Sequence, residues 1–428
     1  MERFFELQRH GTTVRIEILA GITTFLTAAY IIFVNPSILS ETGMDRGALI
    51  TVTCLISGLA TLLLGLWPRV PLMMAPGMGL NAFFTFTLVK SLGLSWQVAL
   101  GAVFYSGILF LLLTVVGVRE RFVRSIPAAL RLSLSIGIGL FITLIGLQNL
   151  GLVVAHPATF ITIGKLKPTV FLGLFGLLVI MYLAARGIRG AILAGILATA
   201  ILGMLLGYGS TPAGVLSLPP SPAPIALRLD FAAIFTVGLW GAIFTMMFVD
   251  LFDSVGTMVG VAYQAGMVQA DGSIPKIGQM LAADAMATAA GALLGTSTTT
   301  TYIESASGIA QGGRSGLTAV TTGVLFLLAM FFTPLIAVVP TYATAPALIA
   351  VGVYMMRGVR EIDFTNWEDA FPSFLTIVLM PFTYSISHGL LFGFLSYVLL
   401  KLALGKWRDL NLVLYLIAAL SVPNLLVS

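Results

Sequence analysis

Fourteen apolar stretches, separated by short polar segments, constrain this chain more than any other feature of its sequence. A membrane-spanning helix needs about 20 mainly apolar residues. Only 9% of the residues are charged, against roughly 25% in soluble domains. The sequence therefore predicts an all-α polytopic membrane protein in a lipid bilayer. The fourteen predicted segments lie at roughly 17–37, 48–67, 70–92, 97–118, 127–149, 168–185, 190–208, 231–262, 277–295, 300–312, 315–340, 343–356, 370–386 and 388–404. A last apolar stretch at 410–427 leaves open a fifteenth crossing or a surface or re-entrant helix.

Lysine and arginine residues are divided unequally between the two ends of these segments. With the N-terminus in the cytoplasm, seventeen of the 22 lie at inner ends, Arg189 and Arg357 among them. The outer ends hold Arg46, Lys90, Lys165, Lys167 and Arg228. The positive-inside rule therefore predicts a cytoplasmic N-terminus and a multi-pass protein of the plasma (inner) membrane. The net charge of +5 reflects this topology and indicates no nucleic-acid partner.

A proline-rich loop at 210–228 divides the segments into two sets of seven. Because seven is odd, the second set must cross the membrane upside down relative to the first. Such a 7+7 inverted repeat is typical of secondary transporters, which bind substrate near the midplane on interrupted helices. Segments 3 and 10 are the interrupted pair, through APGMGLN at 75–81 and GTSTTTTYIESASG at 295–308. We expect a short extended piece followed by a half-helix in each, with Asn81 and Glu304 near the half-helix starts.

Segments 8 and 10 contain three acidic residues, namely Asp250, Asp253 and Glu304. A carboxylate inside a membrane is costly unless it is paired, faces a cavity or carries a proton. Segments 8 and 10 contain no lysine or arginine that could pair with them. The acids therefore predict a cavity and a proton-coupling role for Asp253 or Glu304. Asp250 lies one turn before Asp253 and is expected behind the site or within it.

Carboxylates accept hydrogen bonds, whereas the Asn81 amide both donates and accepts, and purine bases present such mixed edges. Phe25, Phe83, Phe84 and Tyr302 are candidates for an apolar or stacking wall. Asp284, in segment 9, is expected to pack between helices. The predicted substrate-binding residues are Asp253, Glu304, Asn81, Tyr302, Phe83, Thr24, Phe25, Thr301 and Thr257.

Four motifs together resemble the nucleobase:cation symporter family, and most closely its AzgA-like branch of adenine, guanine and hypoxanthine permeases. They are GITTFLTAAYIIFVNP at 21–36, APGMGLNAFF at 75–84, VDLFDSVGT at 249–257 and TTYIESASG at 300–308. The resemblance covers nearly the whole chain. It implies that Asp253 and Glu304 are the family's substrate-binding acids. Uracil permeases carry Tyr-Gly-Glu and a histidine where this chain has Ile303 and Thr257, so the motifs fit the purine branch better.

The resemblance also implies a division into two domains. The core domain would comprise segments 1–4 and 8–11, at 1–118 and 231–340, and the gate domain segments 5–7 and 12–14, at 119–230 and 341–428. The resemblance is compatible with a homodimer through the gate domain, and the oligomeric state is left open. We expect a proton-coupled symporter that imports adenine, guanine or hypoxanthine by alternating access.

Several alternatives stay open at this point. An anion carrier of the same fold would not be expected to place two acids at its site, and a xanthine or uracil permease is a closer alternative. An enzyme is not expected, because no histidine, metal-ligand cluster or activated serine lies near the acids. No cofactor or metal is expected. Saturable, proton-dependent uptake would distinguish a carrier from a channel, and the choice between proton and sodium coupling is left open.

Overall fold

The computed structural model describes residues 2–117, 126–232, 239–269, 273–411 and 414–415, and it is mostly helical. Within these residues, ten helices are long and apolar enough to cross a membrane. The stretch at 410–427 lies mostly outside the described residues, as does the predicted domain boundary at 118–119. The expectation of a helical, multi-pass membrane protein is confirmed.

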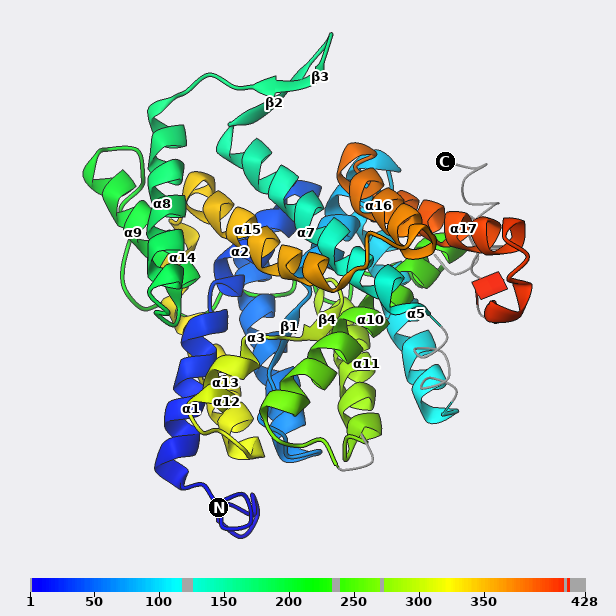
Figure 1. Cartoon of the computed structure of the whole chain (residues 1–428). Coiled ribbons are helices and arrows are strands. Elements are labelled where there is room, and N and C mark those ends of the chain that lie inside the picture. Colours follow the sequence, from blue (N-terminus) through cyan, green and yellow to red (C-terminus); the bar gives the residue numbers. More distant parts are fainter. Residues whose placement is uncertain (1, 118–125, 233–238, 270–272, 412–413, 416–428) are drawn as a thin grey trace.

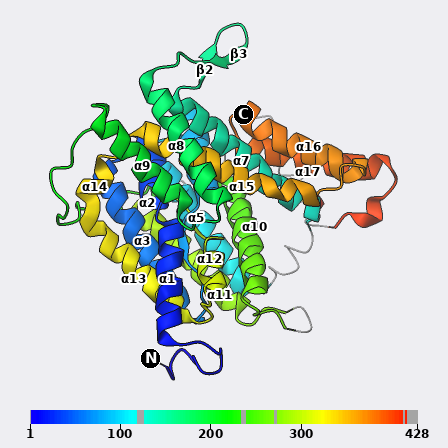
Figure 2. The ribbon, with the colours of Figure 1, turned by 60° about the vertical axis from the view of Figure 1, so that its left-hand side comes forward.

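The helices pack in two groups, which Figures 1 and 2 show one above the other. In the first group, α3 packs against α13, α1 against α13, and α5 against α10 and α11. The first helix group comprises α1 (Val14–Ala28), α2 (Ile31–Leu39), α3 (Arg46–Leu66), α4 (Met78–Ala82), α5 (Trp96–Val115), α10 (Trp240–Gln264), α11 (Ile277–Leu294), α12 (Ser305–Ala310), α13 (Gly316–Ala329) and α14 (Thr333–Ala337).

The second group is centred on α7, against which α15 and α16 pack, while α8 packs against α9 and α15. A hairpin of two exposed strands, β2 (Val153–His156) and β3 (Phe160–Ile163), projects beyond the end of α7 (Figure 1). The second helix group comprises α7 (Ala128–Leu150), α8 (Pro168–Ala185), α9 (Ala191–Leu205), α15 (Thr341–Met355), α16 (Trp367–Phe382) and α17 (Ile386–Ala403). A 3-10 helix, Met356–Glu361, continues α15.

Local sequence signals set where many of these helices begin and end. The Asp45 carboxylate accepts a 2.7 Å hydrogen bond from the Ala48 amide and so caps α3, and Ser95 caps α5 in the same way. Glycines with positive φ, Gly151 and Gly295, end α7 and α11. Capping satisfies the backbone groups that helix ends leave open.

Two buried strands interrupt segments 3 and 10, where the sequence predicts extended pieces. β1 (Met74–Pro76) and β4 (Thr299–Thr301) pair with each other in antiparallel register, with Ala75 opposite Thr300. Backbone of this kind is tolerated at membrane depth only when it is buried and its hydrogen bonds are satisfied. Threonines from α3 and α11 serve the two strands: the Thr61 hydroxyl accepts from the Met74 amide at 3.0 Å, and the Thr288 hydroxyl from the Thr299 amide at 3.1 Å.

Segment 1 also departs from a straight helix. The sequence predicts one uninterrupted stretch at 17–37, but α1 ends at Ala28 and α2 begins at Ile31. The two pieces together form one apolar span of 29 residues, Val14–Thr42, with a bend between them. Tyr30 lies at this interruption, directly before α2.

Candidate functional site

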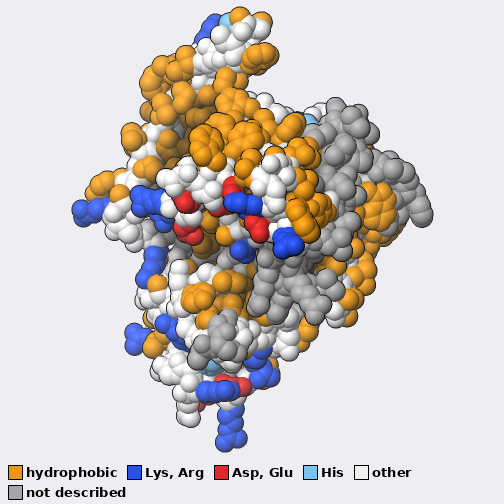
Figure 3. Space-filling model, turned by 45° about the vertical axis from the view of Figure 1, so that its right-hand side comes forward, with side chains coloured by type: hydrophobic (Ala, Val, Ile, Leu, Met, Phe, Trp, Pro, Cys, Tyr) orange, Lys and Arg blue, Asp and Glu red, His pale blue; other side chains and the backbone are white. Residues whose placement is uncertain are grey.

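A cavity of about 610 Å³ lies where the two helix groups meet. The first group contributes residues of α1, α4, α10, β4 and α12, and the second contributes residues of α7, α15, the Met356–Glu361 helix and the turn between α8 and α9. Figure 3 shows acidic and basic side chains in a band across the middle of one face, beside a recess. The cavity therefore depends on both groups for its walls.

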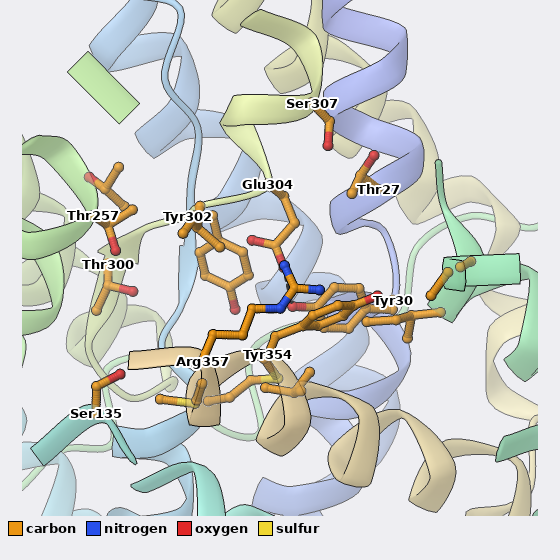
Figure 4. Close-up of a pocket in the computed structure, with 18 of the residues that line it drawn as sticks. Thr27, Tyr30, Ser135, Thr257, Thr300, Tyr302, Glu304, Ser307, Tyr354 and Arg357 are labelled. Carbon is orange, nitrogen blue, oxygen red and sulfur yellow. Dashed lines mark hydrogen bonds between the residues drawn. The ribbon is translucent and has the colours of Figure 1, made fainter. Parts of the chain in front are cut away.

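Glu304 lies in the short connection between β4 and α12, directly before α12. Its half-buried side chain points into the cavity (Figure 4). The hydroxyl of Tyr30 donates a hydrogen bond to Glu304 Oε1 at 2.6 Å. A hydrogen bond to an ionised acceptor is stronger than one between neutral groups. Tyr30 thus fixes one carboxylate oxygen and leaves the other side of the carboxylate toward the cavity.

Asp253 lies on α10 and borders the same cavity, together with Thr257 one turn later and Thr300 on β4. The carboxylates of Asp253 and Glu304 are near enough for their charges to interact. Two like charges in one enclosed space repel each other, so a proton or a ligand with hydrogen-bond donors between them is favoured. The two acids of the cavity are therefore suited to a ligand that carries N–H groups.

Asp250 lies one turn before Asp253 and is buried behind the cavity, not in its wall. Thr288 on α11 donates to Asp250 Oδ2 at 3.1 Å, and the same hydroxyl accepts from the Thr299 amide at 3.1 Å. Asp250 is thereby linked through one side chain to the strand that carries Thr300. This arrangement agrees with a supporting position for Asp250, one of the two roles that its spacing allows.

Tyr302 and Thr301 also border the cavity. The Tyr302 hydroxyl donates to the Pro76 carbonyl at 2.5 Å, and its amide donates to the Met73 carbonyl at 3.0 Å. Tyr302 directly follows β4, and its two partners are Pro76 in β1 and Met73 just before it. Tyr302 therefore holds the two interrupted segments together as well as lining the cavity wall.

Asn81, predicted as a ligand, lies on α4 outside the cavity lining and is completely buried. Its amide donates to Asn35 Oδ1 at 2.6 Å, and Ser297 donates to its carbonyl oxygen. Asn35 in turn donates to Thr53 Oγ1 at 2.7 Å. This network joins α2, α3, α4 and the β4 approach, so in this structure the polar groups of Asn81 are engaged by the protein. A direct contact between Asn81 and substrate stays a prediction.

Three further predicted residues lie outside the cavity lining: Phe83, Thr24 and Phe25. Phe83 is buried at the start of the π-helical stretch Phe83–Ser91. Thr24 is buried on α1 where α12 crosses it at Gly308. Phe25 packs edge-on against Phe326, with ring centroids 5.1 Å apart. Their predicted contacts with substrate stay predictions.

The structure brings in cavity residues that sequence reasoning did not select, chiefly Tyr30, Tyr354, Arg189 and Arg357. The two arginines come from elements outside segments 8 and 10. In the sequence they served only as evidence for the orientation of the segments in the membrane. Arg189 donates to the Gln311 side chain. Tyr30 lies inside the motif at 21–36, and its phenol hydroxyl among apolar residues was the sequence signal that could have identified it as a cavity residue. Within the described residues, no group of three or more His, Cys, Asp or Glu is placed to hold a metal ion.

Proteins of known structure share this architecture. The transmembrane domain of a cyanobacterium bicarbonate transporter, BicA, superposes with a TM-score of 0.67 at 14% sequence identity, covering 87% of this chain and 97% of that chain. At this identity the likeness extends to the fold alone. It supports the assignment of the fold and indicates neither function nor substrate.

Sequence comparison is more specific. Adenine permease AdeQ of Escherichia coli (strain K12) is 45% identical over 421 residues, 98% of this chain and 95% of its own length. Guanine/hypoxanthine permease PbuG of Bacillus subtilis (strain 168) is 43% identical over 427 residues, 97% of each chain. The family model described as "Permease family" matches residues 15–392. These matches confirm the resemblance that the four motifs indicate, and the chain belongs to this permease family.

Proposed function

We propose that this chain is a proton-coupled symporter that imports purine nucleobases by alternating access. The observation that carries the proposal is the pair of carboxylates, Asp253 and Glu304, that face one cavity from two separate elements. Carboxylates accept hydrogen bonds from the ring N–H and amino groups of a purine. The names of relatives more than 40% identical over nearly the whole chain, adenine permease and guanine/hypoxanthine permease, support the same substrate class.

The cost of charge in this place supports proton coupling. A carboxylate within the membrane is stabilised when it carries a proton, and the repulsion between Asp253 and Glu304 adds to this preference. In the proposed cycle, one of the two acids takes up a proton and a base on the outside and releases both inside. The base itself is neutral, so the proton gradient supplies the driving force for its accumulation.

The proposed architecture is the 7+7 inverted repeat, with a core domain at 1–118 and 231–340 and a gate domain at 119–230 and 341–428. The antiparallel pairing of β1 with β4 supports this proposal, because two repeats related by a two-fold axis in the membrane would present their broken segments in opposite directions. The packing of α15 and α16 against α7 supports a separate gate. The proposal places the N-terminus in the cytoplasm and the protein in the plasma (inner) membrane. It also includes a homodimer.

An anion carrier or a xanthine or uracil permease is the alternative within the same fold. Two acids in the cavity wall oppose an anion, although Arg189 and Arg357 also border the cavity. A transport assay distinguishes these possibilities because the three substrate classes differ in charge and ring size.

The test uses purified protein in liposomes with labelled guanine, hypoxanthine, adenine, uracil and bicarbonate. We expect accumulation of at least one purine when the outside is more acidic than the inside, and its loss when a protonophore collapses the gradient. A sodium gradient of equal size should not replace the proton gradient. Uptake of bicarbonate or uracil without any purine would overturn the proposal, and accumulation that requires sodium would overturn its coupling ion.

A further inference from the structure

The cavity contains a basic group that the proposed function does not yet use. Arg357 lies on the Met356–Glu361 helix, which follows α15 directly. In Figure 4 its side chain extends into the cavity toward the carboxylate of Glu304, which enters from the other side. The guanidinium carbon lies 4.9 Å from the centre of the Tyr354 ring, which lines the cavity too. A cation over an aromatic face is held by electrostatic attraction.

Arg357 and the acids make the two sides of the cavity chemically opposite. A guanidinium group offers only hydrogen-bond donors, whereas ionised carboxylates offer only acceptors. Within the described residues, the ion pairs at 4.0 Å or less do not include one between Arg357 and Glu304 or Asp253. The cavity therefore presents separate donor and acceptor groups to whatever enters it.

The purine bases differ in the hydrogen-bond donors and acceptors along their edges, and this arrangement can distinguish them. Guanine and hypoxanthine present two adjacent acceptors, O6 and N7, which match two parallel N–H groups of a guanidinium. Adenine presents a donor, its 6-amino group, beside N7, so one of its N–H groups would face those of arginine. On the other side, the N1–H of a 6-oxopurine, and the 2-amino group of guanine, are donors for a carboxylate.

We infer that Arg357 determines specificity by binding the O6 and N7 edge of the base, so that the preferred cargo is a 6-oxopurine, guanine or hypoxanthine, rather than adenine. This inference rests on the proposed function, since it names the purine that the same cavity takes. Relatives named for adenine and for guanine/hypoxanthine are about equally similar to the chain, so their names do not decide the matter. Xanthine shares O6 and N7 but carries an oxygen at position 2, which would face the acids, and it should bind less well than guanine.

Neighbouring arginines provide the comparison that isolates Arg357. Arg189 borders the cavity, but its guanidinium already donates to Gln311. Arg360 lies on the same 3-10 helix as Arg357, and both side chains are exposed, but Arg360 does not belong to the cavity lining. Arg360→Ala removes the same charge from the same helix and is the matched control.

The experiment measures binding of labelled guanine to the purified full-length protein and its competition by hypoxanthine, adenine and xanthine. The wild-type protein should bind guanine more tightly than adenine. In Arg357→Ala the ratio of guanine to adenine affinity should fall by about 5- to 150-fold, the range expected for one bidentate contact. Arg357→Lys, which keeps the charge but loses the fork of donors, should also lower the ratio. Arg360→Ala should retain the wild-type ratio.

The outcomes separate this inference from the proposed function. Tighter binding of adenine by the wild-type protein, or an equal loss of guanine and adenine affinity in Arg357→Ala, would overturn the role of Arg357 while purine transport stands. If the protein binds no purine at all but transports another labelled solute, the proposed function fails first. A measurable adenine affinity in Arg357→Ala would also show that the variant is folded, so that a changed ratio reports on recognition.

Discussion

The Tyr30 hydroxyl donates a 2.6 Å hydrogen bond to Glu304 Oε1, although the two residues are 274 positions apart in the sequence. The bond joins the bend between α1 and α2 to the short connection between β4 and α12. It is formed because segment 1 is not a straight helix. The position of the proposed substrate-binding acid thus depends on a local irregularity in a segment whose composition is ordinary for a membrane helix.

Tyr30→Phe removes this donor while it keeps the ring. Glu304 would then lose a hydrogen bond to a charged acceptor, which is worth about 1.5–3 kcal/mol. We expect purine affinity to fall by roughly tenfold or more, measured by binding to the purified protein. Tyr105→Phe is the matched control, because the Tyr105 hydroxyl donates to the Phe231 carbonyl at 2.8 Å, away from the cavity. Equal affinity in Tyr30→Phe and the wild type would show that the bond does not position Glu304 for binding.

The crossing of α1 and α12 is unusually close at Gly308. A Cβ atom at this position would lie 2.2 Å from Thr24 Oγ1 and 2.6 Å from the Ala20 carbonyl oxygen. Gly308→Ala must therefore displace α12, and overpacking of this kind typically costs about 1–3 kcal/mol. Because α12 begins directly after Glu304, we expect a lower thermal unfolding midpoint together with a strong loss of purine uptake.

Gly260→Ala is the control for this variant. A Cβ at Gly260 on α10 would meet nothing within 4 Å, and alanine favours a helix over glycine by about 1 kcal/mol. Its unfolding midpoint should stay level or rise. If both variants kept the stability and uptake of the wild type, the close crossing at Gly308 would have no bearing on the site.

Glu17 is a further acid within an apolar span, and its contacts are structural. Its buried carboxylate accepts hydrogen bonds from the amides of Arg314 at 2.8 Å and Thr318 at 3.2 Å, and from the Thr318 hydroxyl at 2.6 Å. These donors lie at the start of α13, where a negative charge is favourable. We expect Glu17→Gln to lose about 1.5–3 kcal/mol of stability, seen as a lower unfolding midpoint in detergent. Glu361→Gln, at an exposed position, should leave the midpoint unchanged, and an equal midpoint for the two variants would contradict this role.

Much of the fold could be predicted from the sequence because hydropathy reports directly on membrane burial. The extended pieces at Met74–Pro76 and Thr299–Thr301 were predictable as well, since proline, glycine and repeated threonine do not favour a regular helix. The bend at Tyr30 was not predictable from such signals. Pro36, inside α2, is the one local helix-breaking residue near it, and its position does not specify an interruption at Ala29 and Tyr30.

The site could be predicted only in part, for a related physical reason. Asp253 and Glu304 stand out because isolated charges in apolar segments are costly and therefore conspicuous. Arg357 does not stand out, because an arginine at a segment end is also what membrane topology requires. Asn81 was selected for its place in an interrupted segment, yet its amide is engaged by Asn35 and Ser297. Which polar group faces the cavity and which faces another polar group is decided by tertiary packing alone.

The most direct test of the account compares uptake of labelled guanine and hypoxanthine by wild-type protein and by Glu304→Gln. Both proteins are reconstituted into liposomes at equal amounts under an inward proton gradient, with Glu361→Gln as the control. Glutamine keeps the size of the side chain but replaces one acceptor oxygen of the carboxylate with an NH2 donor, and it cannot take up the proton. We predict that uptake by Glu304→Gln is lower than that of the wild type by at least about tenfold, while uptake by Glu361→Gln equals that of the wild type. Wild-type uptake by Glu304→Gln would contradict the assignment of this cavity as the transport site.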